Sequence, residues 1–223
     1  YRIKQQGLDE HPRVAVADKL NNLALAASHG IGVAEVYGLW HEHDEIDLAS
    51  LPDEFVIKAN FSAGSRGVLP LRRVPGQADR YVVADTSGRE MTGAEVLKAL
   101  EPERRVRGPW YAEELLVPDA GDDPIPPDYK FYCFYGEVGV GFTRRTPQHF
   151  GTPGWQHQLR FHDFDGQGNT LAYHDRGATG DPTIPLSPLL PEMLEHARTL
   201  SRAVPLPFVR VDLYATTRGV QMG

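Results

Sequence analysis

The chain has 223 residues, a formal net charge of −7, 41% hydrophobic and 24% charged residues, which is ordinary for a globular protein with a sizeable core. The negative charge argues against a general nucleic-acid-binding surface but leaves room for a local basic pocket. No apolar run approaches the roughly 20 residues of a membrane span, and the single cysteine, Cys133, excludes an intramolecular disulfide framework and fits a reducing cytoplasm.

The first elements expected along the chain are a helix and a short strand. Apolar residues recur at helical spacing between Val14 and His29, and Gly30 is a natural helix stop. Residues 36–40 then combine aromatic and branched side chains and predict a strand.

The next stretch joins a lysine-bearing strand to a loop of small residues. Residues 55–60 predict a strand containing Lys58, the sequence FSAGSRG follows, and residues 68–71 predict the returning strand. The ammonium supplies positive charge and glycine lets backbone N–H groups approach an anion, so the stretch suits phosphate. It is not a P-loop, in which the lysine follows the glycines and opens a helix. The alternative interpretation is a hairpin whose lysine is merely solvated.

Three further elements are predicted before the middle of the chain. Residues 81–84 indicate a strand, and residues 92–100 indicate a helix whose first turn carries a capping box of Thr92 and Glu95. Residues 110–117 are strand formers that include two adjacent carboxylates, which a strand directs to opposite faces.

A linker rich in Asp, Gly and Pro separates that strand from a second hairpin. We expect the linker over residues 119–127 and the two hairpin strands over residues 129–135 and 138–143. Cys133 lies in this apolar run, which favours a buried structural thiol over a nucleophile.

Residues 144–188 are polar and glycine-rich, and we expect an irregular loop there. Residues 163–166 begin like a calcium loop, but the later ligands are missing, so a turn is predicted. The histidines of the segment have no short metal-ligand spacing and are interpreted as surface or substrate-side groups: His149, His157, His162 and His174.

The last third ends in a helix and two strands. Residues 191–203 carry proline in the first turn and an apolar stripe, which predicts a helix. Residues 207–214 predict a strand whose alternation places Arg210 and Asp212 on one face. That pair is either a surface ion pair or the floor of a metal–phosphate site. A returning strand is expected to start at residue 220.

In this order the elements resemble the ATP-grasp superfamily, most closely its TupA-like branch, which is associated with teichuronopeptide and other cell-surface polymer synthesis. The resemblance is carried by LPDEFVIK at residues 51–58, AEE at 112–114, DYKF at 128–131 and FVRVDLY at 208–214. It implies an α+β fold in which two α+β subdomains with antiparallel sheets enclose a nucleotide site. It further implies three parts: a lead-in helix and strand (1–50), subdomain 1 with the phosphate loop and hinge strand (51–116), and subdomain 2 with the hairpin, helix and metal strand (117–223).

The resemblance also implies roles for particular residues. Lys58 would contact the ATP phosphates, Arg210 would steady the transferred phosphoryl group, and Asp212 would ligate Mg²⁺. A second metal-binding acid, usual in the family, is expected after Gly223. The other nucleotide contacts implied are the loop residues Ser62, Gly64, Ser65 and Gly67, the hinge residues Glu113, Glu114 and Leu116, the ribose position Asp128 (often a glutamate in the family), and a second phosphate contact, Lys130.

The function implied is that of a cytoplasmic, ATP- and Mg²⁺-dependent carboxylate–amine ligase that forms an amide through an acylphosphate. Its substrates would be a small-molecule, glycan or peptide carboxylate and an amine, and Arg144, Arg145 and residues 146–180 are the segment expected on the substrate side. Two alternatives stay open: phosphoryl transfer to a hydroxyl on the same fold, and a nucleotide-binding module without catalysis.

Overall fold

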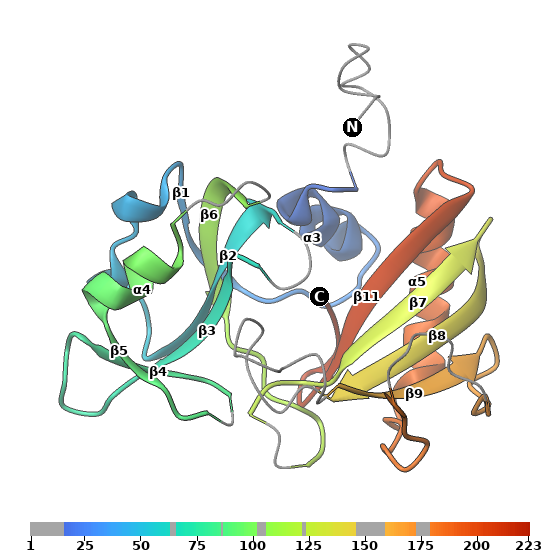
Figure 1. Ribbon diagram of the computed structural model, residues 1–223. Helices are drawn as coiled ribbons and strands as arrows, with labels where there is room; N and C mark the ends of the chain where they lie inside the picture. The colour runs from blue at the N-terminus through green and yellow to red at the C-terminus, as the bar shows by residue number, and fades with distance from the viewer. Residues whose placement is uncertain are drawn as a thin grey trace. The chain divides into compact units, whose positions relative to one another are not determined.

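A computed structural model describes residues 16–62, 66–85, 87–101, 106–121, 124–145, 159–172 and 179–223. These residues form two compact units (Figure 1). Unit 1 contains the described residues up to 33, those of 127–145 and those from 159 onward, and unit 2 contains those between 34 and 126. Unit 1 therefore collects segments from both ends of the chain. The division at residues 50 and 116 follows chain order and stays a prediction.

Unit 2 is built on a six-stranded sheet whose neighbouring strands are all antiparallel. In spatial order the strands are β1 (Val36–Trp40), β6 (Arg107–Glu114), β2 (Glu54–Phe61), β3 (Val68–Arg73), β4 (Arg80–Val83) and β5 (Glu90–Thr92). Helix α4 (Gly93–Ala99) follows β5 and begins with the predicted capping box of Thr92 and Glu95. Two short 3₁₀ turns, His43–Glu45 and Leu48–Ser50, lie between β1 and β2.

Alternation along β2 decides which side chains enter the main core of unit 2. Phe55, Ile57 and Ala59 are all fully buried in that core. Val56 and Lys58 point to the opposite face of the sheet because side chains of a strand alternate. The predicted lysine-bearing strand and its returning partner β3 are confirmed.

Unit 1 is built on a second six-stranded sheet, antiparallel except at one edge. In spatial order its strands are β10 (Thr179–Gly180), β9 (Arg160–Asp165), β8 (Glu137–Arg145), β7 (Asp128–Phe134), β11 (Phe208–Thr216) and β12 (Gly219–Met222), with β9 and β10 parallel. Its helices are α3 (Lys19–Ser28) and α5 (Leu190–Ala203). Together the two sheets and few helices confirm the predicted α+β class.

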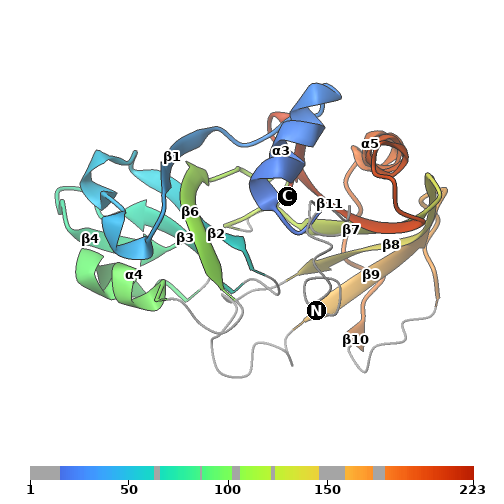
Figure 2. The same cartoon turned by 90° about the horizontal axis from the view of Figure 1, so that it is seen from above.

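One face of the unit 1 sheet packs against α5 (Figure 2). The helix contributes Met193, Ala197 and Leu200, and the strands contribute Phe131 and Leu213, all buried in a single core. Because this face takes the odd-numbered residues of β7 and β11, their even-numbered residues lie on the other face. Among the described residues no helix is both long and apolar enough to cross a membrane.

Part of the predicted irregular loop is a strand. Residues 163–165 belong to β9, and the chain turns only after Asp165, whose carboxylate accepts backbone hydrogen bonds from Gln167 and Asn169. His162 is not a surface group: it is 5% exposed, and its ring nitrogens lie 2.6 Å from the Ile184 oxygen and 2.8 Å from Thr170 Oγ1. The prediction failed because polar residues occupy buried positions of this strand. His149, His157 and His174 lie outside the described residues.

Candidate functional site

Lys58 forms a buried ion pair in unit 2. Its Nζ lies 2.5 Å from Glu113 Oε1. In the β2–β6 register Lys58 faces Tyr111 and Val56 faces Glu113, so the two charged side chains are diagonal neighbours on one face. Lys58 is 8% exposed and Glu113 is 3% exposed. The interpretation of Lys58 as a solvated lysine is therefore wrong.

The second oxygen of Glu113 is a buried acceptor. Glu113 Oε2 has no hydrogen-bond partner within the described part of the chain. Leaving a buried acceptor unsatisfied costs on the order of 1–3 kcal/mol, more when the group is charged. This oxygen and the adjacent ammonium group of Lys58 form a polar spot between apolar neighbours, and such a spot favours a polar ligand or water.

The loop after β2 is only partly described. Ser62 Oγ donates a hydrogen bond to the Ala59 oxygen at 3.2 Å. Gly67 has a φ of +60°, and a Cβ there would lie 2.6 Å from Val106 Cγ1. Glycine at this position is therefore required by the turn and its packing, whatever else the loop binds. The predicted phosphate contacts Gly64 and Ser65 lie outside the described residues.

The predicted hinge residues follow or end β6. The backbone N–H of Glu114 donates to the Glu35 oxygen at 2.8 Å, and Glu114 Oε2 accepts from the Glu35 N–H at 3.3 Å. Leu116, two residues further on, is buried at 6% exposure. The main chain of Glu114 is thus held by strand pairing, and its carboxylate also binds backbone.

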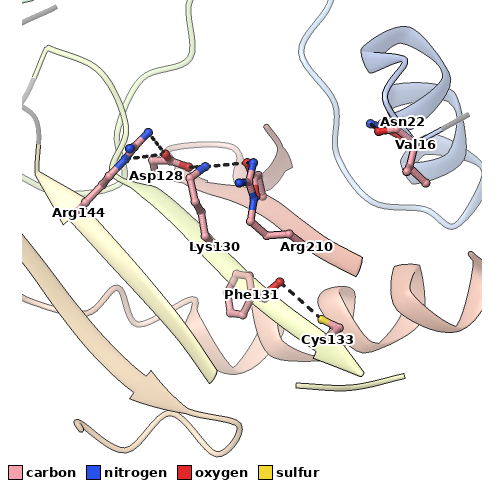
Figure 3. Close-up of polar contacts among 9 residues, drawn as sticks. Val16, Asn22, Asp128, Lys130, Phe131, Cys133, Arg144 and Arg210 are labelled. Atoms are coloured by element: carbon pink, nitrogen blue, oxygen red, sulfur yellow. Dashed lines mark hydrogen bonds and ion pairs between the residues drawn. The ribbon is translucent and has the colours of Figure 1, made fainter. Parts of the chain in front are cut away.

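In unit 1, charged side chains of three adjacent strands form a chain of contacts that we call the charged ladder (Figure 3). It lies on the sheet face opposite α5 and consists of Arg144, Asp128, Lys130, Asp212 and Arg210. Arg144 Nη2 lies 2.7 Å from Asp128 Oδ2, and Lys130 Nζ lies 2.9 Å from Asp128 Oδ1 and 2.6 Å from Asp212 Oδ2. Arg210 binds Asp212 through two nitrogens, at 2.6 and 2.7 Å.

Strand register explains why these five side chains meet. Lys130 of β7 lies directly opposite Asp212 of β11, and Asp128 lies directly opposite Arg144 of β8. Residues directly opposite in an antiparallel pair share a face, and Arg210 shares the face of Asp212 two residues away. The sequence pattern grouped Arg210 with Asp212 as neighbours on one strand face, but not across strands. Arg144, expected on the substrate side, lies in the ladder beside Asp128.

The ladder carries more positive than negative charge. Of its described members three are cations and two are carboxylates, a formal sum of +1. Burial alone would raise the pKa of Asp128, but the charges and hydrogen bonds of Lys130 and Arg144 outweigh it and hold that pKa below its ordinary value. Burial would lower the pKa of Arg210, but Asp212 outweighs burial and raises it.

The ladder is suited to anions, and its carboxylates are suited to a hard cation. Arg210 is its most open member, with a side chain 48% exposed, whereas the side chain of Lys130 is 10% exposed. Carboxylate oxygens are the ligands that Mg²⁺ prefers. Within the described ranges no three His, Cys, Asp or Glu side chains group as a metal site. Asp212, the predicted ligand, has both oxygens bound to Lys130 or Arg210.

Comparison with known protein families matches residues 25–223 to the TupA-like ATP-grasp family. A search among curated proteins gives no match. Among solved structures, D-alanine–D-alanine ligase from Bacillus anthracis is 13% identical, with a TM-score of 0.51 over 94% of this chain and 56% of that one. N5-carboxyaminoimidazole synthase from Aspergillus clavatus, in complex with ADP and 5-aminoimidazole ribonucleotide, is 15% identical, with a TM-score of 0.53 over 95% of this chain and 44% of that one.

The ATP-grasp ligase PsnB, complexed with a precursor variant, Mg and ADP, is 15% identical with a TM-score of 0.48, over 95% of this chain and 50% of that one. The chain spans about half the length of these solved structures. At such identities the likeness to the D-alanine–D-alanine ligase and to the synthase, each with a TM-score above 0.5, shows a shared fold. With the family match it confirms the predicted ATP-grasp fold. The family match covers most of the chain, from the helix α3 to the last strand: this protein belongs to the TupA-like ATP-grasp family.

Proposed function

We propose that the protein is an ATP-dependent carboxylate–amine ligase that binds ATP together with Mg²⁺. The observation that carries this proposal is the charged ladder, because it combines a surplus of cations with carboxylates on one sheet face. Family membership supports the same conclusion. A phosphate-bearing substrate needs the cations, and a divalent metal needs the carboxylate.

In this proposal basic residues bind the phosphates of ATP. Lys58 and Lys130 supply ammonium groups, and Arg210 supplies a guanidinium that can bind two oxygens of the transferred phosphoryl group. Asp212 is the residue that would hold Mg²⁺, which when bound would neutralise phosphate charge. The proposal assigns contacts with the base to the hinge residues Glu113, Glu114 and Leu116. It assigns contacts with the phosphates to the loop residues Ser62, Gly64, Ser65 and Gly67.

The proposed reaction needs positioning and charge neutralisation rather than a protein nucleophile. A carboxylate oxygen of the substrate attacks the γ-phosphorus, the bond to ADP breaks, and an acylphosphate forms. An amine then attacks the acyl carbon, inorganic phosphate leaves, and the amine loses a proton. Arg210 would bind the transferred group throughout. Burial raises the pKa of Cys133 to about 11, so this thiol is protonated at neutral pH and is no nucleophile, as predicted.

The substrates we propose are a carboxylate and an amine carried by a small molecule, a glycan or a peptide. The association of TupA-like proteins with cell-surface polymer synthesis supports a role in making such a polymer. Arg145, at the end of β8, and residues 146–180 stay the proposed substrate side, although 146–158 and 173–178 lie outside the described residues.

The test is calorimetric titration of ATP, with and without Mg²⁺, into the parent chain and its Lys58→Ala and Asp212→Asn variants. We expect ATP binding that Lys58→Ala weakens and a Mg²⁺ dependence that Asp212→Asn abolishes. Arg72→Met, which breaks an exposed ion pair, and Asp53→Asn, which removes the charge of an exposed carboxylate, serve as controls.

Phosphate release with acid and amine mixtures then tests the chemistry. Turnover that needs both a carboxylic acid and an amine supports the ligase. Turnover with a hydroxyl acceptor alone would indicate phosphoryl transfer, and binding without turnover would indicate a nucleotide-binding module. A parent chain that binds no ATP contradicts the proposal.

A further inference from the structure

Asp128 occupies the position expected to bind the ribose hydroxyls, yet both of its oxygens already have cationic partners. Oδ1 accepts a hydrogen bond from Lys130 at 2.9 Å, and Oδ2 accepts from Arg144 Nε at 3.0 Å and lies 2.7 Å from Arg144 Nη2. The side chains of Asp128 and Arg144 are each 17% exposed. A diol would have to compete with two charge-assisted contacts, which are about twice as strong as neutral hydrogen bonds.

Asp128 also lies where it can fix the ammonium group of Lys130. A lysine side chain is flexible and carries about 2 kcal/mol of rotamer entropy. Here Nζ is bound between Asp128 on its own strand and Asp212 on the neighbouring strand. The two carboxylates define one position for this group on the sheet face opposite α5. If Asp212 binds a metal ion, Asp128 is the remaining ion-pair partner of Lys130 among the described residues.

Arg144 completes the arrangement from the third strand. It lies directly opposite Asp128 in the β7–β8 register and binds its other oxygen, so the carboxylate is held from both sides. The lowered pKa of Asp128 accords with this setting, since both neighbours favour its charged form. The order of contacts is therefore Arg144 to Asp128 to Lys130.

We propose that Asp128 and Arg144 are positioning residues that fix the Lys130 ammonium group where it can bind a phosphate of the nucleotide. Asp128 itself does not bind the ribose hydroxyls. The inference rests on the proposed function, because it assumes that a nucleotide phosphate binds the ladder. It assigns to a position expected to recognise sugar a role in recognising phosphate.

The experiment compares three probes that differ in ribose and phosphate: ATP, 2′,3′-dideoxy-ATP and inorganic tripolyphosphate. Each is titrated with Mg²⁺ into the parent chain and into Asp128→Asn, Arg144→Met and Lys130→Met. Positioning predicts that Asp128→Asn and Arg144→Met weaken all three probes by a similar factor, about tenfold for the loss of one charge-assisted contact. Asp128→Asn added to Lys130→Met should cause no further loss, because the group that it positions is gone.

Two outcomes would overturn the inference while ATP binding persists. If Asp128→Asn weakens ATP but leaves dideoxy-ATP and tripolyphosphate unchanged, Asp128 reads the ribose. If its effect is undiminished in the Lys130→Met background, it acts independently of Lys130. Thermal unfolding of each variant checks folding. Arg144→Lys keeps the charge and should therefore retain part of the tripolyphosphate affinity that Arg144→Met loses. This comparison tests the inference even if Asp128→Asn does not fold. A parent chain that binds neither ATP nor tripolyphosphate would overturn the proposed function and, with it, this inference.

Discussion

Lys58 and Lys130 are both 8% exposed lysines on inner strands, yet their surroundings differ. Within the part of the chain that the structure describes, Lys58 has one ion-pair partner, Glu113, and that pair lies on a face shared with the buried Val56. Lys130 lies between two carboxylates, each of which has an arginine as a second partner. In the first case charge is balanced within one pair, and in the second it is distributed along a sheet face.

Because the surroundings differ, removing each lysine should have different consequences for the carboxylates that it binds. Without Lys58, the buried Glu113 carboxylate would lose the ion-pair partner of its Oε1, and its Oε2 already has no hydrogen-bond partner among the described residues. Without Lys130, Asp128 and Asp212 would each keep an arginine. The pair in unit 2 should therefore matter more for stability, and the ladder in unit 1 should matter more for ligand binding.

The largest effect is expected from Lys58→Met. Breaking a buried ion pair on one side typically costs about 3–5 kcal/mol because the remaining charge has no partner. We expect a loss of that order in the free energy of unfolding, measured by urea denaturation. The double variant Lys58→Met/Glu113→Gln should recover much of the loss. A single-variant loss below about 1 kcal/mol would show that water or another group already satisfies Glu113.

A smaller loss of stability is expected from Lys130→Met. Hydrogen bonds to charged groups contribute about 1.5–3 kcal/mol. We expect a loss of that size in the free energy of unfolding, because Asp128 and Asp212 each keep an arginine partner. Affinity for tripolyphosphate, by contrast, should fall while unfolding stays cooperative. Urea denaturation measures the stability of the variant, and calorimetry measures its affinity for tripolyphosphate. Equal stability losses for Lys58→Met and Lys130→Met would remove the distinction between the two sites.

The ladder should also affect how the free energy of unfolding depends on pH. The pKa of Asp128 is lowered in the folded state, so its contribution is fully present above the unfolded-state value, about 3.9, and is lost as pH falls from there through the folded-state pKa. In Asp128→Asn the free energy of unfolding should fall less steeply below about pH 4. Urea denaturation from pH 2.5 to 6 tests this, with Asp53→Asn as the control. Identical slopes for parent chain and variant would contradict the assigned cause.

The smallest effect is expected from Arg72→Met. Arg72 Nε lies 2.8 Å from Glu54 Oε1 across β2 and β3, but the side chains are 42% and 53% exposed. Exposed pairs contribute about 0.2–1 kcal/mol and are screened by salt. Thermal unfolding at low and high salt should show a salt-dependent stability for this pair but not for the buried Lys58–Glu113 pair, whose lysine also lies on β2. A loss above about 2 kcal/mol would mean that exposure is a poor guide here.

Much of the fold follows from local sequence patterns. Apolar runs in β2 and β7, alternation in β11 and the apolar stripe of α5 identify those elements, and the Thr92–Glu95 capping box locates the start of α4. The face shared by Arg210 and Asp212 also follows from the period of a strand. Strand β9 was missed because buried polar residues such as His162 hide its pattern, and their hydrogen-bond partners lie elsewhere in the chain.

The composition of the site was decided by pairing between distant segments. Lys58 meets Glu113 because β2 and β6, some 50 residues apart, pair in one register among several that sequence alone permits. Arg144 depends on a finer feature, a register shift in the β7–β8 hairpin between Tyr132 and Cys133. Continuing the pairing of Phe134 with Glu137 without that shift would set Thr143 opposite Asp128 and turn Arg144 to the core face. Residue types and strand periods thus determined which charges share a strand face, whereas bulges and long-range register, set by packing of the whole sheet, decided which of them touch.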